Sequence, residues 1–174
     1  FGSAILDISN GNTEVNGNFK AGVNKGSQGE IKISGKANLT VKKDFIVGEN
    51  GRATVTHSGG KINIEGKLII GNSDNATSTF NMTDGTLESN EITLHNPANF
   101  KFSGGTLKTK KITGTFKNSG GNFTIGDTEI NTLSTSGIIG FSTAADMIKK
   151  HTQIIGDYIQ EYGDILISSL TLTI

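Results

Sequence analysis

Residues that could perform acid–base chemistry are sparse in this chain. The sole arginine, Arg52, lies in the turn sequence ENGRAT after Glu49, and Asp74 could join them from the next repeat. Polysaccharide lyases and hydrolases built on parallel β-helices need clustered carboxylates with Arg or Lys on one face. Charges in turns are usually solvated surface groups. We therefore expect an exposed charge at Arg52 and no catalytic residues.

The histidines and the C-terminal acids lack the spacing of metal ligands. His57, His95 and His151 lie in separate segments, and Asp157 and Asp164 are isolated. His57 and His95 could meet on neighbouring turns, but a solvated or hydrogen-bonded histidine is the commoner state. There is no GxSxG nucleophile motif, and the SGGT glycines do not precede a predicted helix as a phosphate-binding loop requires. The sequence predicts no metal, no cofactor and no enzymatic activity.

Four Asn-X-Thr sequons could carry N-linked glycans in an exported protein. They begin at Asn38, Asn75, Asn81 and Asn122. Such triplets are glycosylation acceptors in secreted proteins, but several arise by chance in a chain rich in Asn and Thr. The sequence leaves glycosylation open.

A repeated strand phrase must position all of these residues. It occurs as TEVNGNFKAG at 13–22, LTVKKDFIVG at 39–48 and INIEGKLIIG at 62–71. Each copy has a β-branched residue, a large apolar residue three or four positions later, and a closing glycine. A period of roughly 20 to 26 residues is typical of a solenoid, in which each repeat buries its apolar face against its neighbours.

A second repeated phrase supplies the corner between strands. Its second glycine falls at Gly60, Gly85, Gly105 and Gly121, at spacings of 25, 20 and 16 residues. Glycine suits a corner because it accepts φ > 0, and the shrinking spacing predicts shorter turns toward the C-terminus. The alternation that follows places four apolar side chains on an inner face. These are Ile62, Ile64, Phe123 and Ile125.

These phrases predict an all-β fold, a right-handed parallel β-helix of roughly six turns over residues 1–140. The expected inner ladder is Val15, Val41, Ile64, Leu87, Leu107 and Phe123. Recurring phenylalanines could form a sugar-stacking stripe, but stacking in the core is the favoured interpretation. They are Phe19, Phe45, Phe80, Phe100, Phe102, Phe116 and Phe123. Residues 141–174 are expected to add a short helix near 143–153 and terminal strands within the same domain.

The composition argues against several classes of partner and excludes disulfide bonds. The chain has 16 basic and 16 acidic residues, whereas nucleic acids and anionic membranes favour a basic excess. With 24 glycines, one proline and no cysteine, it has an all-β composition and cannot form disulfides. No apolar run is long enough for a transmembrane segment. Because the chain begins at Phe1, we expect a processed mature protein or an excised fragment.

Residues 45–167 resemble the glycine-rich passenger repeats of bacterial autotransporter and PEP-CTERM type surface proteins. The matching segments are LIIGNSDNATSTFNMTDGTL, FKFSGGTLKTKKITGTFKNSGGNF and GDYIQEYGDILI. The resemblance implies a right-handed parallel β-helix exported to the cell exterior, with roles that run from adhesion to matrix building. The helix expected near 143–153 departs from the family pattern.

The sequences of both termini are typical of β-strands, and these strands could pair with another subunit. The ends of a β-solenoid expose unpaired backbone groups, and the uncharged segment 165–174 could add to such an edge, head to tail. The candidate assembly residues are Ile5, Leu6, Ile8, Leu166, Leu170, Leu172 and Ile174. Alternatively, this segment folds back as the last strand and the helix caps the tube.

We therefore expect a non-catalytic extracellular or cell-surface protein, structural or adhesive, that self-associates into a filament or matrix. Surface glycans or a host surface are additional expected partners. The alternative function is a carbohydrate-active β-helix enzyme or a polysaccharide-binding module.

Overall fold

A computed structural model describes residues 2–72, 78–95, 100–125, 130–135, 138–141, 158–160 and 165–166. The strands are β1 (Ser3–Val15), β2 (Phe19–Ala21), β3 (Gln28–Val41), β4 (Phe45–Val47), β5 (Arg52–Ile70), β6 (Ser78–Leu94), β7 (Phe100–Phe102), β8 (Thr106–Asn118), β9 (Asn122–Ile125), β10 (Ile130–Thr135), β11 (Ile138–Phe141), β12 (Tyr158–Gln160) and β13 (Ile165–Leu166).

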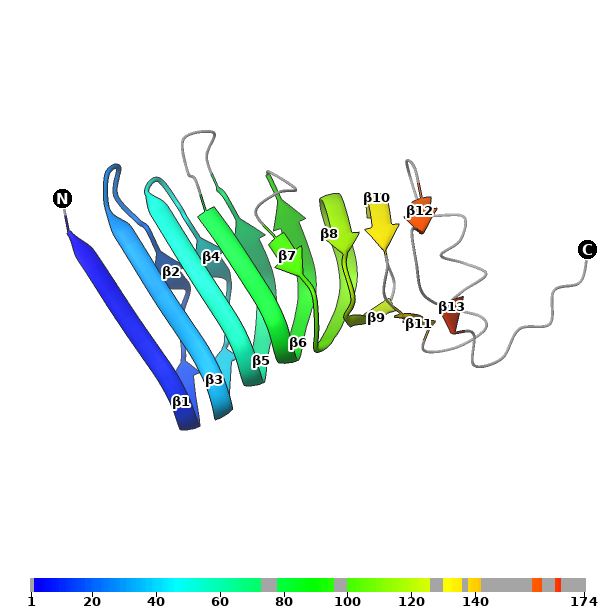
Figure 1. Cartoon of the computed structure of the whole chain (residues 1–174). Helices are drawn as coiled ribbons and strands as arrows, with labels where there is room; N and C mark the ends of the chain where they lie inside the picture. Colours follow the sequence, from blue (N-terminus) through cyan, green and yellow to red (C-terminus); the bar gives the residue numbers. More distant parts are fainter. Residues whose placement is uncertain are drawn as a thin grey trace, which may run out of the picture.

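The strands stack as a parallel β-solenoid of about four turns. The long strands β1, β3, β5 and β6 lie side by side in that order, and on another face the short strand β2 pairs with β4, which in turn pairs with the last residues of β5 (Figure 1). Parallel pairing follows from the repeat, because each turn places its strands over the same strands of the preceding turn. The prediction of an all-β parallel solenoid is confirmed, whereas the predicted count of roughly six turns is larger than the number seen.

The turns shorten along the chain as the corner phrases predict. Lys61 pairs with Thr86, Thr86 with Thr106, and Thr106 with Asn122. These pairs give offsets of 25, 20 and 16 residues (86 − 61, 106 − 86 and 122 − 106). The spacing of the corner glycines therefore correctly predicted the number of residues in each turn.

Alternation along β5 shows how the sequence forms these strands. In the segment ATVTH, the side chains of Ala53, Val55 and His57 are buried, whereas Thr54 and Thr56 between them are half-buried on the outer face. Successive side chains of a strand point to opposite faces, so the apolar set enters the tube and the threonines face outward. The β-branched residues also favour the extended backbone.

The predicted inner ladder is two ladders rather than one. Val15, Val41 and Ile64 share one register position. The second ladder lies two residues earlier in each strand and contains Leu39, Ile62, Leu87, Leu107 and Phe123. Its members up to Leu107 are buried, so both sets face the core. The prediction that Ile62 and Ile64 both point inward is confirmed; the single ladder was wrong because the register between the repeats was not visible.

The predicted phenylalanines whose side chains the structure describes, all except Phe123, stack inside the tube as the favoured interpretation expected. Phe45, Phe80, Phe100, Phe102 and Phe116 are at most 2% exposed. Ring centroids of Phe80 and Phe100 lie 5.4 Å apart, and those of Phe100 and Phe116 lie 5.5 Å apart. The partly buried Phe19 stacks on Phe45 at 4.7 Å and continues the series to the first turn. Such offset and edge-to-face pairs add stability beyond area burial.

The corner glycines are required by both backbone conformation and space. Gly60 has φ = +75°, and a Cβ there would lie 2.3 Å from the carbonyl oxygen of Ala37. Gly85 has φ = +88°, and its Cβ would lie 2.6 Å from Nε2 of His57. Only glycine accepts this conformation without strain and also lets neighbouring turns approach so closely.

The helix predicted near 143–153 lies outside the described residues. Among the residues that the structure does place, none belongs to a helix of the length and apolarity needed to cross a bilayer.

Candidate functional site

Ion pairs between neighbouring turns involve four glutamates, Glu49, Glu65, Glu88 and Glu91. Glu88 lies between two lysines, Lys61 at 2.7 Å and Lys108 at 3.1 Å. These hydrogen bonds, that from Lys61 first, lower the pKa of the Glu88 carboxyl. A general acid in glycoside hydrolysis needs a raised pKa, so Glu88 is unsuited to that role. The other cross-turn pairs are Lys20–Glu49, Lys42–Glu65 and Lys67–Glu91.

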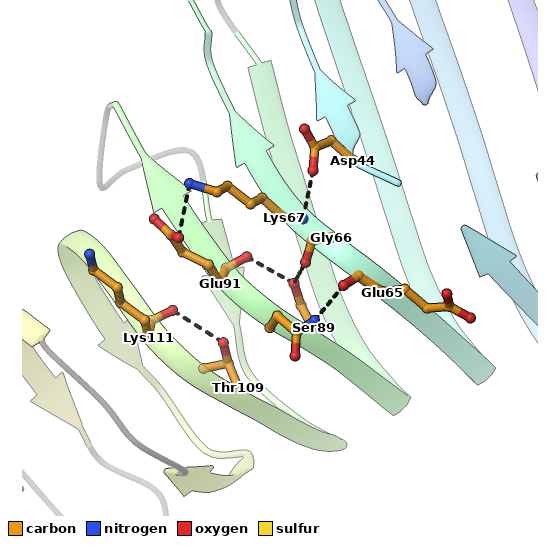
Figure 2. A network of polar contacts seen from close by, with 9 residues as sticks. Asp44, Glu65, Gly66, Lys67, Ser89, Glu91, Thr109 and Lys111 are labelled. Atoms are coloured by element: carbon orange, nitrogen blue, oxygen red, sulfur yellow. Dashed lines mark hydrogen bonds and ion pairs between the residues drawn. The ribbon is translucent and has the colours of Figure 1, made fainter. Parts of the chain in front are cut away.

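Polar side chains near Gly66, and one turn further along the tube, form hydrogen bonds with backbone groups (Figure 2). The buried hydroxyl of Ser89 donates to the carbonyl oxygen of Glu91 at 2.8 Å, and Thr109 repeats this bond one turn later, to Lys111 at 3.1 Å. Asp44 accepts the backbone N–H of Lys67 at 2.9 Å. Buried hydroxyl groups such as those of Ser89 and Thr109 need hydrogen-bond partners, and these bonds hold the corner together.

The acid–base cluster considered around Arg52 does not assemble in the described residues. Glu49 accepts a hydrogen bond from Lys20 at 2.6 Å, and Asp74 lies outside the described residues. Arg52 is exposed, as predicted, and lines a groove of about 390 Å³ together with Lys25 and Asn50. Its neighbours in this groove are basic or neutral.

His57 lies fully inside the tube, where the sequence analysis expected solvation or a hydrogen bond. Its side chain is 0% exposed, and neither ring nitrogen has a hydrogen-bond partner among the described residues. Burial lowers the pKa of its imidazole, and the backbone of Gly60 and Gly59 and the Asp84 carboxylate offset only part of that effect. The alternation along β5 could have predicted that His57 is buried, because His57 continues the inward-facing series of Ala53 and Val55.

We expect His57 to lower the free energy of unfolding in mildly acidic solution, at pH values above those at which carboxylates titrate. The unfolded state has a histidine pKa near about 6.5, whereas the folded state holds it lower, so the unfolded state binds more protons. The free energy of unfolding should therefore fall as the pH drops through about 6.5. Urea unfolding between pH 8 and pH 5.5 measures this slope.

His57→Met should remove most of that slope, because methionine fills the core without a titrating group. His95 is exposed, so His95→Gln is the matched control and should keep the wild-type slope. Equal slopes for His57→Met and the wild type would contradict the assignment.

The other histidines and acids weighed as metal ligands do not come together among the described residues. His95 is exposed and follows the end of β6, whereas His57 pairs with Met82 near the start of that strand. His151, Asp157 and Asp164 lie outside the described residues. Within the ranges that the structure describes, no three His, Cys, Asp or Glu residues form a group that could hold a metal ion.

The sequons occupy different environments. Asn38 and Asn122 are exposed and Asn81 is half-buried, all within strands, whereas Asn75 lies outside the described residues. Asn38 donates a side-chain hydrogen bond to Asn12 at 3.0 Å, one turn earlier. Glycosylation stays a prediction at these sites.

The first turn exposes apolar side chains at the open end of the solenoid. β1 pairs with β3 on one side and has no second strand partner in the described part of the chain. Ile5 is 68% exposed and Leu6 42%, whereas Ile8 is buried in the core. Among the C-terminal assembly candidates, the structure describes only the backbone of Leu166, in β13.

A groove of about 320 Å³ opens at this end, lined by Ile5, Leu6, Phe19, Val23 and Ile31 among others. Val23 is 39% exposed and was missed from the sequence, because nothing in its local context shows that it lies beside β1. The groove at Lys25 and Arg52 was missed for the same reason, since its two loops are a full turn apart in the chain.

Comparison with protein-family models, with curated proteins and with solved structures found no match.

Proposed function

We propose that this chain is a non-catalytic structural or adhesive β-solenoid of the cell exterior that self-associates end to end. The observation that carries this proposal is the first turn, where the 13-residue strand β1 pairs with β3 alone among the described residues and exposes Ile5 and Leu6 near the exposed Val23. Free strand edges are templates for pairing, and monomeric proteins usually cover or charge them. The glutamates that form cross-turn ion pairs hold neighbouring turns together, which is a structural rather than a catalytic role.

The contact would be head to tail. Leu166 pairs within the subunit, through β13 and β11, so Leu170, Leu172 and Ile174 would supply the incoming strand. Backbone pairing would give affinity, and the groove at Phe19 and Val23 would select side chains. A heterologous interface whose rotation does not close produces an open fibre. A filament or surface matrix is the expected product.

Two finer features belong to this proposal. We expect a right-handed coil, because strand–crossover–strand connections in parallel sheets favour that hand, and a short helix near 143–153. A crystal structure with a left-handed coil, or with strands across 143–153, would overturn the respective feature.

Lysines placed at the open end should block assembly. Ile5→Lys/Val23→Lys puts two charges beside an edge that must be desolvated, while both positions are exposed in the folded subunit. The wild type should form larger species with rising concentration in sedimentation velocity, and the variant should stay monomeric.

Ser58→Lys/Thr83→Lys is the control, because it adds the same charge at exposed positions on the side of the tube. It should assemble like the wild type. A wild-type protein that stays monomeric at millimolar concentration would contradict end-to-end association.

The alternative, a carbohydrate-active enzyme, is tested by incubation with plant and microbial polysaccharides. The proposal predicts no new reducing ends or unsaturated products. Turnover that is lost when one acidic residue is neutralised would overturn it.

A further inference from the structure

Two loops from neighbouring turns form a groove with a rigid floor. Residues 25–28 precede and begin β3, residues 50–52 precede and begin β5, and both segments line the same cavity of about 390 Å³. The N–H of Arg52 donates to the carbonyl oxygen of Ser27 at 2.9 Å, and the Asn50 side chain donates to that of Val23 at 3.1 Å. These bonds lock the loops together, so the groove exists before any ligand arrives.

Gly51 allows the close contact at the floor. A Cβ there would lie 2.4 Å from the carbonyl oxygen of Asn24 and 2.7 Å from that of Ser27. Any larger residue would push the loops apart. The groove therefore depends on tight backbone packing rather than on mobile side chains.

The groove holds two positive charges without compensation. Lys25 and Arg52 form no ion pair with any described residue, unlike Lys20, Lys42 and Lys61, and no carboxylate lines the cavity. Glu49, next to Asn50 in sequence, is already bound by Lys20. In a chain of zero net charge, this is a local excess that an anionic ligand would neutralise.

The lining also limits the kind of anion. It consists of Lys, Arg, Gly, Ser, Gln and Asn, with no apolar or aromatic side chain. Nucleic-acid bases would lack a stacking surface, and apolar peptide side chains would find nothing to pack against. Arg52 can bind a carboxylate or sulfate through two parallel N–H groups, while Gln28 and Asn50 offer amide groups to hydroxyls.

We propose that the groove formed by Lys25, Gln28, Asn50 and Arg52 binds saccharides that carry a carboxylate or a sulfate. This extends the adhesive part of the proposed function by naming a ligand class. It does not depend on self-association, because the groove lies in the corner loops rather than on the free edge of β1.

The test is calorimetric titration of the full chain with trigalacturonate, with a sulfated chondroitin tetrasaccharide and with neutral maltotriose. At least one acidic sugar should bind at about 1 mM or tighter and weaken as salt is added. Lys25→Gln/Arg52→Gln should bind it at least about tenfold more weakly, because two charged contacts are lost.

Lys36→Gln/Lys43→Gln is the matched control, since it removes the same charge from exposed lysines outside the groove. It should bind within about twofold of the wild type. Preference for trigalacturonate assigns the carboxylate and preference for the tetrasaccharide assigns the sulfate.

Three results would overturn the site: no acidic sugar binds, maltotriose binds as well, or the groove variant binds like the control. A monomeric wild type in sedimentation, by contrast, would contradict only the assembly proposal.

Discussion

Ile64→Asp should lower the free energy of unfolding by about 3 to 5 kcal/mol or prevent folding. Ile64 is 2% exposed and lies in register between Val41 of the preceding turn and Ser89 of the next. The substitution removes apolar contacts with both turns and buries a carboxylate where the described part of the chain places no Lys or Arg among the buried residues. Urea unfolding at pH 7 measures the loss.

Thr56→Asp is its control on the same strand. Thr56 points outward, is half-buried, and pairs with Lys32 of the preceding turn. Its change should stay within about 0.5 kcal/mol of the wild type. If both variants unfold at the same urea concentration, the inward orientation of Ile64 is wrong.

Gly60→Ala should cost about 2 to 4 kcal/mol, although it adds a single methyl group. The residue has φ = +75°, and the new Cβ would lie 2.3 Å from the oxygen and 3.0 Å from the nitrogen of Ala37. Both contacts are to backbone, so relief requires β3 and β5 to separate. Thermal unfolding should show a clear drop in Tm.

Two other glycines separate the causes of that loss. Gly11 has φ = +80° but no atom within 4 Å of its Cβ position, and Gly17 has neither constraint. Gly11→Ala should cost about 1 kcal/mol, and Gly17→Ala should be close to neutral. A Gly60→Ala variant as stable as Gly11→Ala would show that the close approach of the turns is wrong.

The sequence predicted the solenoid because its main determinants are local. The closing glycines, the corner glycines and the alternation in KINIEGKLII each report on one residue's conformation or face, and their spacing reports the length of a turn. The buried phenylalanines followed, because equivalent positions of successive turns stack. Hydroxyls at Ser89 and Thr109 show that even polar inward positions obey this pattern when the backbone satisfies them.

Features that depend on register between turns could not be predicted in the same way. The prediction stepped 23 residues from Ile64 to Leu87 (87 − 64), whereas β5 and β6 pair Ile64 with Ser89 and Ile62 with Leu87, each 25 residues apart (89 − 64 and 87 − 62). The predicted inner ladder therefore divides into two. The groove at Lys25 and Arg52 and the exposed Val23 arise from loops more than twenty residues apart. Local sequence contains no measure of how such loops meet.

The most direct test of the parallel solenoid uses the absence of cysteine from this chain. Thr54 pairs with Thr79, and Thr56 with Asn81. Adjacent strands lie about 4.8 Å apart, within the Cα range of a disulfide. We therefore predict that Thr54→Cys/Thr79→Cys and Thr56→Cys/Asn81→Cys each form an intramolecular disulfide on mild oxidation, as measured by intact mass. Antiparallel pairing can align only one of these pairs and would place the other about 13 Å apart, so a disulfide in only one variant, or in neither, would contradict the parallel register.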